Sequence, residues 1–229
     1  MSPDLDDALR VAREAAAAAA DVLLHYWKIG VETEIKADAT PVTAADREAE
    51  QVIRQIIGKA FPGHAIHGEE QGLHGEGSVR WLVDPLDGTR SFVRRTPFFS
   101  TQIALMVDGE LVLGVSSAPV YGETLWATRG GGAWNDKGRL QVADTSDLAH
   151  ASLSTGNIAT LAAGPHWMTL GELMVAVERM RGLGDFLHYH LLAQGALDIV
   201  IESDVNILDI AALTVIVREA GGIFTDLDG

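Results

Sequence analysis

The 229-residue chain contains no cysteine. Disulfide bonds, thiolate nucleophiles and zinc sites with thiolate ligands are therefore excluded, and the composition is compatible with a reducing compartment. Long apolar runs are also missing, because no stretch reaches the roughly 20 apolar residues of a membrane-spanning helix. Charged residues interrupt the N-terminal region where a signal peptide would need its apolar segment. These absences predict a cytoplasmic protein with no membrane partner.

Basic residues are scarce. The chain has 17 Lys and Arg against 32 Asp and Glu, which gives a formal net charge of −15. Non-specific nucleic-acid binding needs clustered Lys and Arg, so we expect no nucleic-acid partner. The length and an apolar content of 47% fit one large domain, or two small ones, with a substantial buried core.

Two helices are expected in the first 63 residues. Ser2 as N-cap and Pro3 at the first helical position start a helix that continues to about Trp27. The second helix follows Thr43, which lies three residues before Asp46 as in a capping box. Its apolar residues recur at helical spacing until the Pro-Gly pair at residues 62–63.

Strands dominate from about residue 79 to 135. Asp108-Gly109 lies between two β-rich runs and is a strong hairpin signal, and residues 123–138 add another strand pair. The remaining elements are expected as strands at 151–154 and 197–201, helices at 167–180 and after Gly184, and a last helix directly after Asp209. This order predicts a layered α+β architecture with largely antiparallel central strands.

Acidic residues stand where elements begin or end. Glu69 and Glu70 follow a short apolar stretch, "WLVDPLDGTR" places Asp84 and Asp87 after an apolar strand, and Asp209 precedes the last helix. Hard divalent cations such as Mg²⁺ bind oxygen ligands, so these carboxylates and the Leu86 carbonyl could hold two metal ions. Two metals would suit an in-line phosphoryl displacement by water. Backbone N–H groups of Gly88 and Thr89 would then offer a phosphate site.

Simpler interpretations stay open for each residue. Asp-Pro and Asp-Gly are common in turns, so Asp84 and Asp87 could be turn formers. Asp209 could be a helix N-cap, and Glu69-Glu70 could be an exposed loop. Asp46 is first a capping-box residue, with a supporting role behind the metal site at most.

Three motifs together resemble the inositol monophosphatase family: "GEE", "DPLDGT" and "LDIAALTVIVREAGG", in this order. The resemblance extends from about residue 36 to residue 229. It implies the layered α-β-α-β-α sandwich of inositol monophosphatases and fructose-1,6-bisphosphatases. It also implies a Mg²⁺-dependent, lithium-sensitive phosphatase of small phosphate monoesters. One phosphatase domain is expected, with a metal- and phosphate-binding lobe at about 1–145 and a substrate-specificity lobe at 146–229.

The same resemblance implies roles for individual residues. Two or three Mg²⁺ ions would be bound by Glu69, Asp84, the Leu86 carbonyl, Asp87 and Asp209. Glu69 and Thr89 would position the attacking water with support from Asp46, and Gly88 and Thr89 would hold the phosphate. Leu208 departs from the tryptophan usual in the family, which we expect to alter packing and not ligation.

The substrate is expected to be chosen by the C-terminal half. Glu202 matches the family position that contacts the non-phosphate part of the substrate, and the pattern around Asp185 is similar to the family's histidinol-phosphate phosphatases. Both carboxylates could face the ammonium and imidazole of histidinol phosphate. Asp185 could equally be an N-cap after Gly184. His188 and His190 are predicted to be structural or surface residues.

The same residues are compatible with other activities. Inositol monophosphatase and fructose-1,6-bisphosphatase are the alternative activities, and a non-catalytic metal-binding protein is the alternative of a different class. Family members are often dimers, so a homodimer is expected. The chain ends at "FTDLDG", whereas family members usually continue for a further strand and helix, so a truncated C-terminal lobe is one interpretation.

Overall fold

The computed structural model describes residues 3–31, 33–35 and 41–229. Its helices are α1 (Leu5–Ile29), α2 (Ala44–Ala60), α3 (Thr89–Val93), α4 (Ile158–Ala163), α5 (Trp167–Ala176), α6 (Asp185–Ala193) and α7 (Ile207–Glu219), with short 3₁₀ turns at Pro119–Tyr121 and Leu148–His150. Its strands are β1 (Thr33–Ile35), β2 (Pro41–Thr43), β3 (Ala65–Gly68), β4 (Gly72–His74), β5 (Val79–Asp87), β6 (Ser100–Val107), β7 (Glu110–Ala118), β8 (Glu123–Thr128), β9 (Gly132–Asn135), β10 (Gly138–Arg139), β11 (Ser152–Thr155), β12 (Arg179–Arg181) and β13 (Ile199–Ile201).

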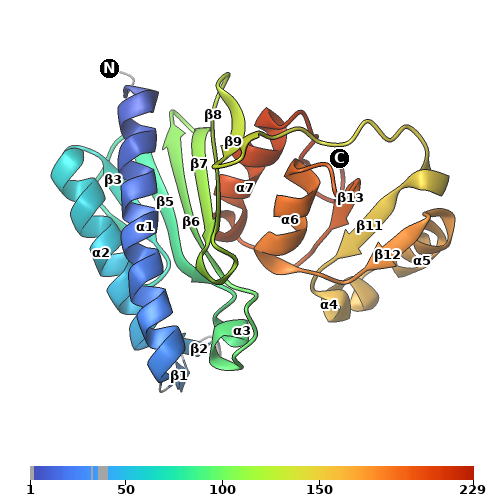
Figure 1. Ribbon diagram of the computed structural model, residues 1–229, viewed down its shortest axis with the longest axis horizontal. Coiled ribbons are helices and arrows are strands. Elements are labelled where there is room, and N and C mark those ends of the chain that lie inside the picture. The colour runs from blue at the N-terminus through green and yellow to red at the C-terminus, as the bar shows by residue number, and fades with distance from the viewer. Residues whose placement is uncertain (1–2, 32, 36–40) are drawn as a thin grey trace.

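The elements form five layers (Figure 1). Helices α1 and α2 cover one face of a large sheet, and α6 and α7 lie between this sheet and a smaller one. Helices α4 and α5 lie beyond the smaller sheet. The α-β-α-β-α sandwich expected from the resemblance is therefore confirmed.

The two sheets differ in strand direction. Within the described residues, the large sheet has eight strands in the order β10-β9-β8-β7-β6-β5-β3-β4, and the small sheet has three in the order β12-β11-β13. All pairs of the large sheet are antiparallel except β3 with β5. The small sheet is entirely parallel. The prediction of antiparallel central strands thus holds for the large sheet only.

The strongest local predictions are confirmed. Asp108 and Gly109 join β6 to β7 with φ angles of 51° and 87°, the positive values that a tight hairpin turn requires. Thr43 and Asp46 form a reciprocal capping box at the start of α2. Alanines at positions 8, 12, 15, 16 and 19 make up most of the buried face of α1 and, with no side chain beyond Cβ, let it approach α2 and the sheet closely.

Three predicted helix ends were wrong or cannot be compared. Ser2 lies outside the described residues, and α1 is capped by Asp4, whose carboxylate accepts backbone N–H bonds from the first turn. The helix expected at 167–180 ends at Ala176, because residues 179–181 pair with β11 as a strand. The last helix begins at Ile207, so Asp209 lies inside its first turn and is not the N-cap. In the described part of the chain, no helix is long and apolar enough to cross a membrane.

Candidate active site

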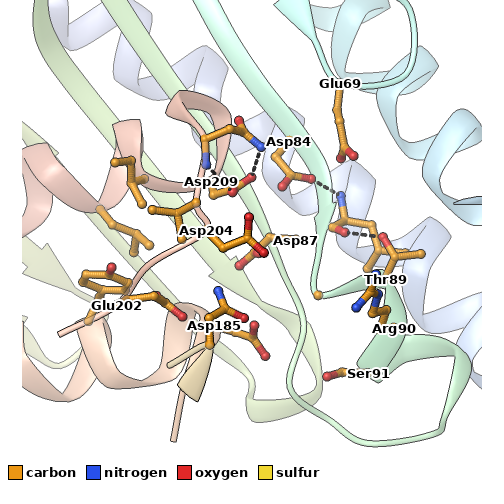
Figure 2. Close-up of a pocket in the computed structure, with 18 residues that line it drawn as sticks. Glu69, Asp84, Asp87, Thr89, Arg90, Ser91, Asp185, Glu202, Asp204 and Asp209 are labelled. Atoms are coloured by element: carbon orange, nitrogen blue, oxygen red, sulfur yellow. Dashed lines mark hydrogen bonds between the residues drawn. The ribbon is translucent and has the colours of Figure 1, made fainter. Parts of the chain in front are cut away.

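A cavity of about 330 Å³ opens where β5 ends, which is within the size range of small-molecule sites. Figure 2 shows Glu69, Asp84 and Thr89 on one side and Asp185 and Glu202 on the other. The cavity gathers most of the residues predicted from the sequence: Glu69, Asp84, Leu86, Asp87, Gly88, Thr89, Asp185, Glu202 and Asp209.

A β-bulge explains how Asp84 and Asp87 reach the same cavity. Residues three apart on a regular strand point to opposite faces of the sheet. Here Asp84 pairs with Gln102 while Asp87 pairs with Ser100, so β5 carries one extra residue between them. The hydroxyl of Thr101 donates to the Pro85 carbonyl at 3.0 Å within this bulge. Both aspartates consequently line the cavity.

The chain then turns sharply into α3. Gly88 has a φ of 85°, and a Cβ at this position would lie 2.5 Å from the Phe98 carbonyl oxygen. Glycine is therefore required both by the left-handed backbone and by the neighbouring chain. As the sequence predicted, Gly88 and Thr89 stand at a helix start, with Gly88 as the N-cap of α3.

Asp46 lies behind the cavity wall and does not line it. Its side chain is fully buried, accepts the hydroxyl of Thr43 at 2.6 Å and lies 3.0 Å from the hydroxyl oxygen of Thr89. The Thr89 hydroxyl lies equally far, 3.0 Å, from the Leu86 carbonyl oxygen. The supporting role predicted for Asp46 therefore has a direct structural route, through the orientation of Thr89.

Asp209 is held at the third position of α7. Its carboxylate accepts the backbone N–H and the side-chain amide of Asn206, each at 2.8 Å, while Asn206 caps Leu208. The hydrogen bonds explain why the N-cap interpretation of Asp209 was wrong: asparagine occupies that position. Leu208 is buried against α7 neighbours and the large sheet.

The far wall comes from α6 and the segment after β13. Gly184 is the N-cap of α6, so Asp185 is its first residue, makes no capping bond and lines the cavity. Glu202 accepts a hydrogen bond from the Nε2 of His188 at 2.9 Å. His188 and His190 are both fully buried, which fits the predicted structural role and excludes a surface one.

Burial and mutual repulsion both disfavour the charged forms of the carboxyl groups in this cavity. Burial, followed by the charges of Glu69 and Asp87, raises the pKa of Asp84 well above its ordinary value. Burial, followed by Asp185 and Asp209, does the same to the pKa of Asp87. Within the described residues, no Lys, Arg or His forms an ion pair with Asp84, Asp87 or Asp209. Clustered carboxylates of this kind favour a bound cation.

The donor set fits Mg²⁺ chemically, because carboxylate and carbonyl oxygens are the ligands this ion prefers. The side chains are not arranged as a closed ligand shell: within residues 3–31, 33–35 and 41–229, no three acidic or histidine side chains are grouped to hold one ion. Mutual repulsion between like charges favours such a spread.

The metal-free protein is expected to lose stability as the pH rises through the raised pKa values of these carboxyl groups. Burial, followed by the charge of Glu202, raises the pKa of Asp185 from 3.8 to about 6. A group whose pKa is higher in the folded state contributes stability that is complete below the unfolded pKa and is lost through the folded one. Asp185→Asn should therefore be stabilised relative to wild type at about pH 8, and this advantage should vanish near pH 4. Thermal melts in chelator at both pH values measure the difference in melting temperature between variant and wild type. A difference that did not change with pH would contradict the raised pKa of Asp185.

Several lining residues were missed from the sequence. Arg90 and Ser91 follow directly after the "DPLDGT" motif, and Asn157, Tyr189 and Asp204 come from the far wall. Asp204 has a φ of 58°, a conformation that asparagine and aspartate tolerate better than other non-glycine residues. The signal that could have found Arg90 and Ser91 is their adjacency to the turn that the sequence predicts to bind phosphate.

Known proteins resemble this chain along almost its whole length. The model of the inositol monophosphatase family matches residues 4–229. A histidinol-phosphatase of Streptomyces coelicolor is 38% identical, covering 99% of this chain and 89% of that protein. A histidinol-phosphatase of Mycobacterium tuberculosis is 42% identical, covering 90% of this chain and 82% of that protein. The solved inositol monophosphatase of Anabaena (Nostoc) is 30% identical with a TM-score of 0.83, covering 96% of this chain and 83% of that one.

Proposed function

This chain belongs to the inositol monophosphatase family, whose members are Mg²⁺-dependent phosphatases of small phosphorylated substrates, and from that premise we propose that it hydrolyses histidinol phosphate. The reaction would serve histidine biosynthesis. Water attacks phosphorus in line, a new P–O bond forms, and the ester P–O bond to histidinol breaks. The attacking water loses a proton, and the leaving oxygen gains one.

Five groups of this chain would hold the Mg²⁺ ions, two or three in number: Glu69, Asp84, the Leu86 carbonyl, Asp87 and Asp209. When bound, Mg²⁺ neutralises the clustered carboxylates and stabilises negative charge on the transferring phosphoryl group. The Leu86 carbonyl has two lone pairs, so it can ligate a cation while the Thr89 hydroxyl lies against it.

Glu69 and Thr89 would position the attacking water, and the Glu69 carboxylate would take its proton. Asp46 is a positioning residue in this scheme, because it orients the Thr89 hydroxyl and lies behind the cavity wall. The backbone N–H groups of Gly88 and Thr89 would hold the phosphate at the turn into α3.

The acidic far wall carries the substrate assignment. Histidinol phosphate has an ammonium group and an imidazole that can be protonated, whereas an inositol ring is neutral. Asp185 and Glu202 line the cavity opposite the phosphate-binding turn, and Asp204 adds a third carboxylate there (Figure 2). These groups favour a cationic substrate through charge-assisted hydrogen bonds. The two histidinol-phosphatase relatives support the same choice.

The proposal is tested by comparing kcat/KM for histidinol phosphate, inositol 1-phosphate and fructose 1,6-bisphosphate in Mg²⁺. We expect histidinol phosphate to be preferred. Asp185→Asn should lower kcat/KM for histidinol phosphate by about 10–100-fold, mainly through KM, because one hydrogen-bonded charge contact is lost. The same variant should leave hydrolysis of inositol 1-phosphate nearly unchanged, since that substrate offers no cation.

Other outcomes would change the assignment. A preference for inositol 1-phosphate or fructose 1,6-bisphosphate would keep the phosphatase chemistry and overturn the substrate. No release from any of the three esters in Mg²⁺ would favour the non-catalytic metal-binding alternative.

We also propose that the boundary between the two lobes lies near residue 145. Residues 140–147 connect β10 of the large sheet to the small-sheet side of the molecule, which supports this boundary (Figure 1). Helix α7 returns from the second lobe to pack on the large sheet, so Asp209 reaches the metal site from that lobe. We further propose that the chain forms a homodimer, and light scattering in solution, which measures the molar mass, tests this proposal.

A further inference from the structure

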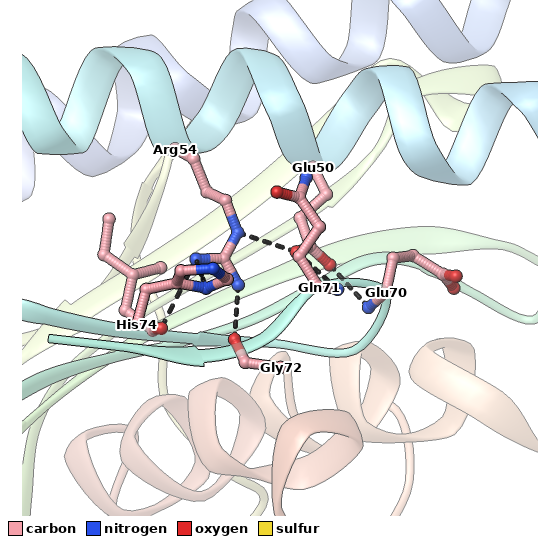
Figure 3. Close-up of polar contacts among 7 residues, drawn as sticks. Glu50, Arg54, Glu70, Gln71, Gly72 and His74 are labelled. Atoms are coloured by element: carbon pink, nitrogen blue, oxygen red, sulfur yellow. Dashed lines mark hydrogen bonds and ion pairs between the residues drawn. The ribbon is translucent and has the colours of Figure 1, made fainter.

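Glu50 is a buried carboxylate to which the proposed mechanism gives no role. It lies on α2 with 0% of its surface exposed. Its Oε2 accepts the backbone N–H of Glu70 at 2.7 Å, and its Oε1 accepts that of Gln71 at 3.0 Å. One side chain of α2 therefore satisfies two successive peptide N–H groups directly after Glu69 (Figure 3).

Arg54 completes the arrangement one turn further along α2. Its Nε donates to Glu50 Oε1 at 2.7 Å, and its two terminal nitrogens donate to the carbonyls of Gly72 at 2.5 Å and Ile66 at 3.4 Å. Arg54 thus bonds to both strands, β3 and β4, that enclose the Glu69 loop (Figure 3). The guanidinium fork makes these contacts simultaneously, which the single nitrogen of a lysine cannot do.

The loop is shaped to receive this pair. A Cβ at position 68 would overlap the carboxylate of Glu50, so any side chain immediately before Glu69 would displace that carboxylate. On the other side, the backbone N–H of Glu69 donates to the Val83 carbonyl at 3.1 Å. The Glu69 backbone is consequently fixed both to β5, next to Asp84, and to α2.

The same face of α2 also carries Asp46. Asp46, Glu50 and Arg54 are spaced four residues apart and so lie in one row along the helix. Asp46 contacts Thr89, and Glu50 contacts the loop of Glu69. One rigid helix thereby positions both residues that the proposed mechanism assigns to the attacking water.

We propose that Glu50 and Arg54 form a positioning pair that aims Glu69 at the metal site and so sets the affinity for Mg²⁺. The inference rests on the proposed function, because it takes Glu69 as a metal ligand. Groups that orient metal ligands without touching the metal change metal affinity by about 10–100-fold when they are mutated. Loss of the pair should therefore appear as weaker Mg²⁺ binding.

The experiment compares wild type with Glu50→Gln, Arg54→Lys and the control Glu48→Gln. Glu48 lies on the same helix but accepts a hydrogen bond from the Tyr26 hydroxyl, away from the loop. Mg²⁺ affinity is measured from the Mg²⁺ dependence of the melting temperature, and the half-saturating Mg²⁺ concentration is measured in the hydrolysis assay. We expect Glu50→Gln to weaken Mg²⁺ binding by about 10–100-fold. Arg54→Lys should weaken Mg²⁺ binding less, and Glu48→Gln should leave it unchanged. Saturating Mg²⁺ should restore the activity of the Glu50→Gln and Arg54→Lys variants.

The outcomes distinguish failure of the positioning proposal from failure of the proposed function. Wild-type Mg²⁺ affinity in a folded Glu50→Gln or Arg54→Lys protein would overturn the proposal, even if the metal-free melting temperature fell. If Glu50→Gln does not fold, Arg54→Lys carries the test. A wild-type protein whose melting temperature ignores Mg²⁺ would instead overturn the proposed function, so the two failures are distinguishable.

Discussion

Asp87→Asn is expected to lower Mg²⁺-dependent phosphate release by at least about 1,000-fold, because removing a charged ligand forfeits several kcal/mol of transition-state stabilisation. The metal-free variant should nevertheless melt no lower than wild type. Desolvation, followed by the like charges of Asp185 and Asp209, raises the pKa of Asp87, so a neutral amide removes both the cost of desolvating a charge and the repulsion. The amide oxygen can still accept the Ser100 hydroxyl, which lies 3.1 Å from Asp87 Oδ2.

Activity assays and thermal melts in chelator and in Mg²⁺ measure both effects on the same samples. The Mg²⁺-induced rise in melting temperature should shrink in the variant, because Mg²⁺ stabilises only the folded state that binds it. Ser100→Ala is the matched control, since it removes the hydrogen bond and keeps the carboxylate. A variant that loses activity only because it melts well below wild type would contradict the assignment of Asp87 as a ligand.

Glu69→Gln is expected to lower kcat by about 10²–10⁴-fold, the usual contribution of a positioned general base. The amide cannot accept the proton of the attacking water, although its size is almost unchanged. The KM for histidinol phosphate should change little, because the proposed contacts to the phosphate and to the cationic groups come from other residues. Steady-state kinetics at saturating Mg²⁺ separate the two parameters.

The neighbouring residue provides the control. Glu70→Gln makes the same chemical change one position further on, and the Glu70 side chain is half-buried and does not line the cavity. We expect its kcat to stay near that of wild type. Equal losses in both variants would mean that the loop tolerates no change, and Glu69 would then have no special place in the reaction.

Much of the fold could be predicted because local signals agreed with the tertiary structure. The capping box at Thr43 and the Asp-Gly hairpin at residues 108–109 satisfy their own backbone groups, so they need no distant partner to be recognised. By contrast, residues 179–181 are a strand only because the edge of β11 supplies their hydrogen bonds. Their sequence, with Met180 continuing an apolar pattern, favoured the end of a helix instead.

The candidate site also combines features that the local sequence predicts with features that depend on distant contacts. The acids at the ends of elements were predicted to converge, and they do line one cavity. The bulge that turns Asp84 and Asp87 to the same side depends on the register with β6, which the sequence of β5 alone does not contain. Glu50 and Arg54 were missed because a glutamate and an arginine in a helix are mostly exposed. Only the packing of α2 on the Glu69 loop buries Glu50 completely and leaves the Arg54 side chain 12% exposed.

The account depends most directly on a cation joining the carboxylates of Glu69, Asp84, Asp87 and Asp209. The measurement that tests this is phosphate release from histidinol phosphate as Mg²⁺ is titrated into chelator-treated protein. We predict no release without metal and a saturable rise as Mg²⁺ is added. Undiminished release in chelator, or no release at any Mg²⁺ concentration, would contradict the central claim.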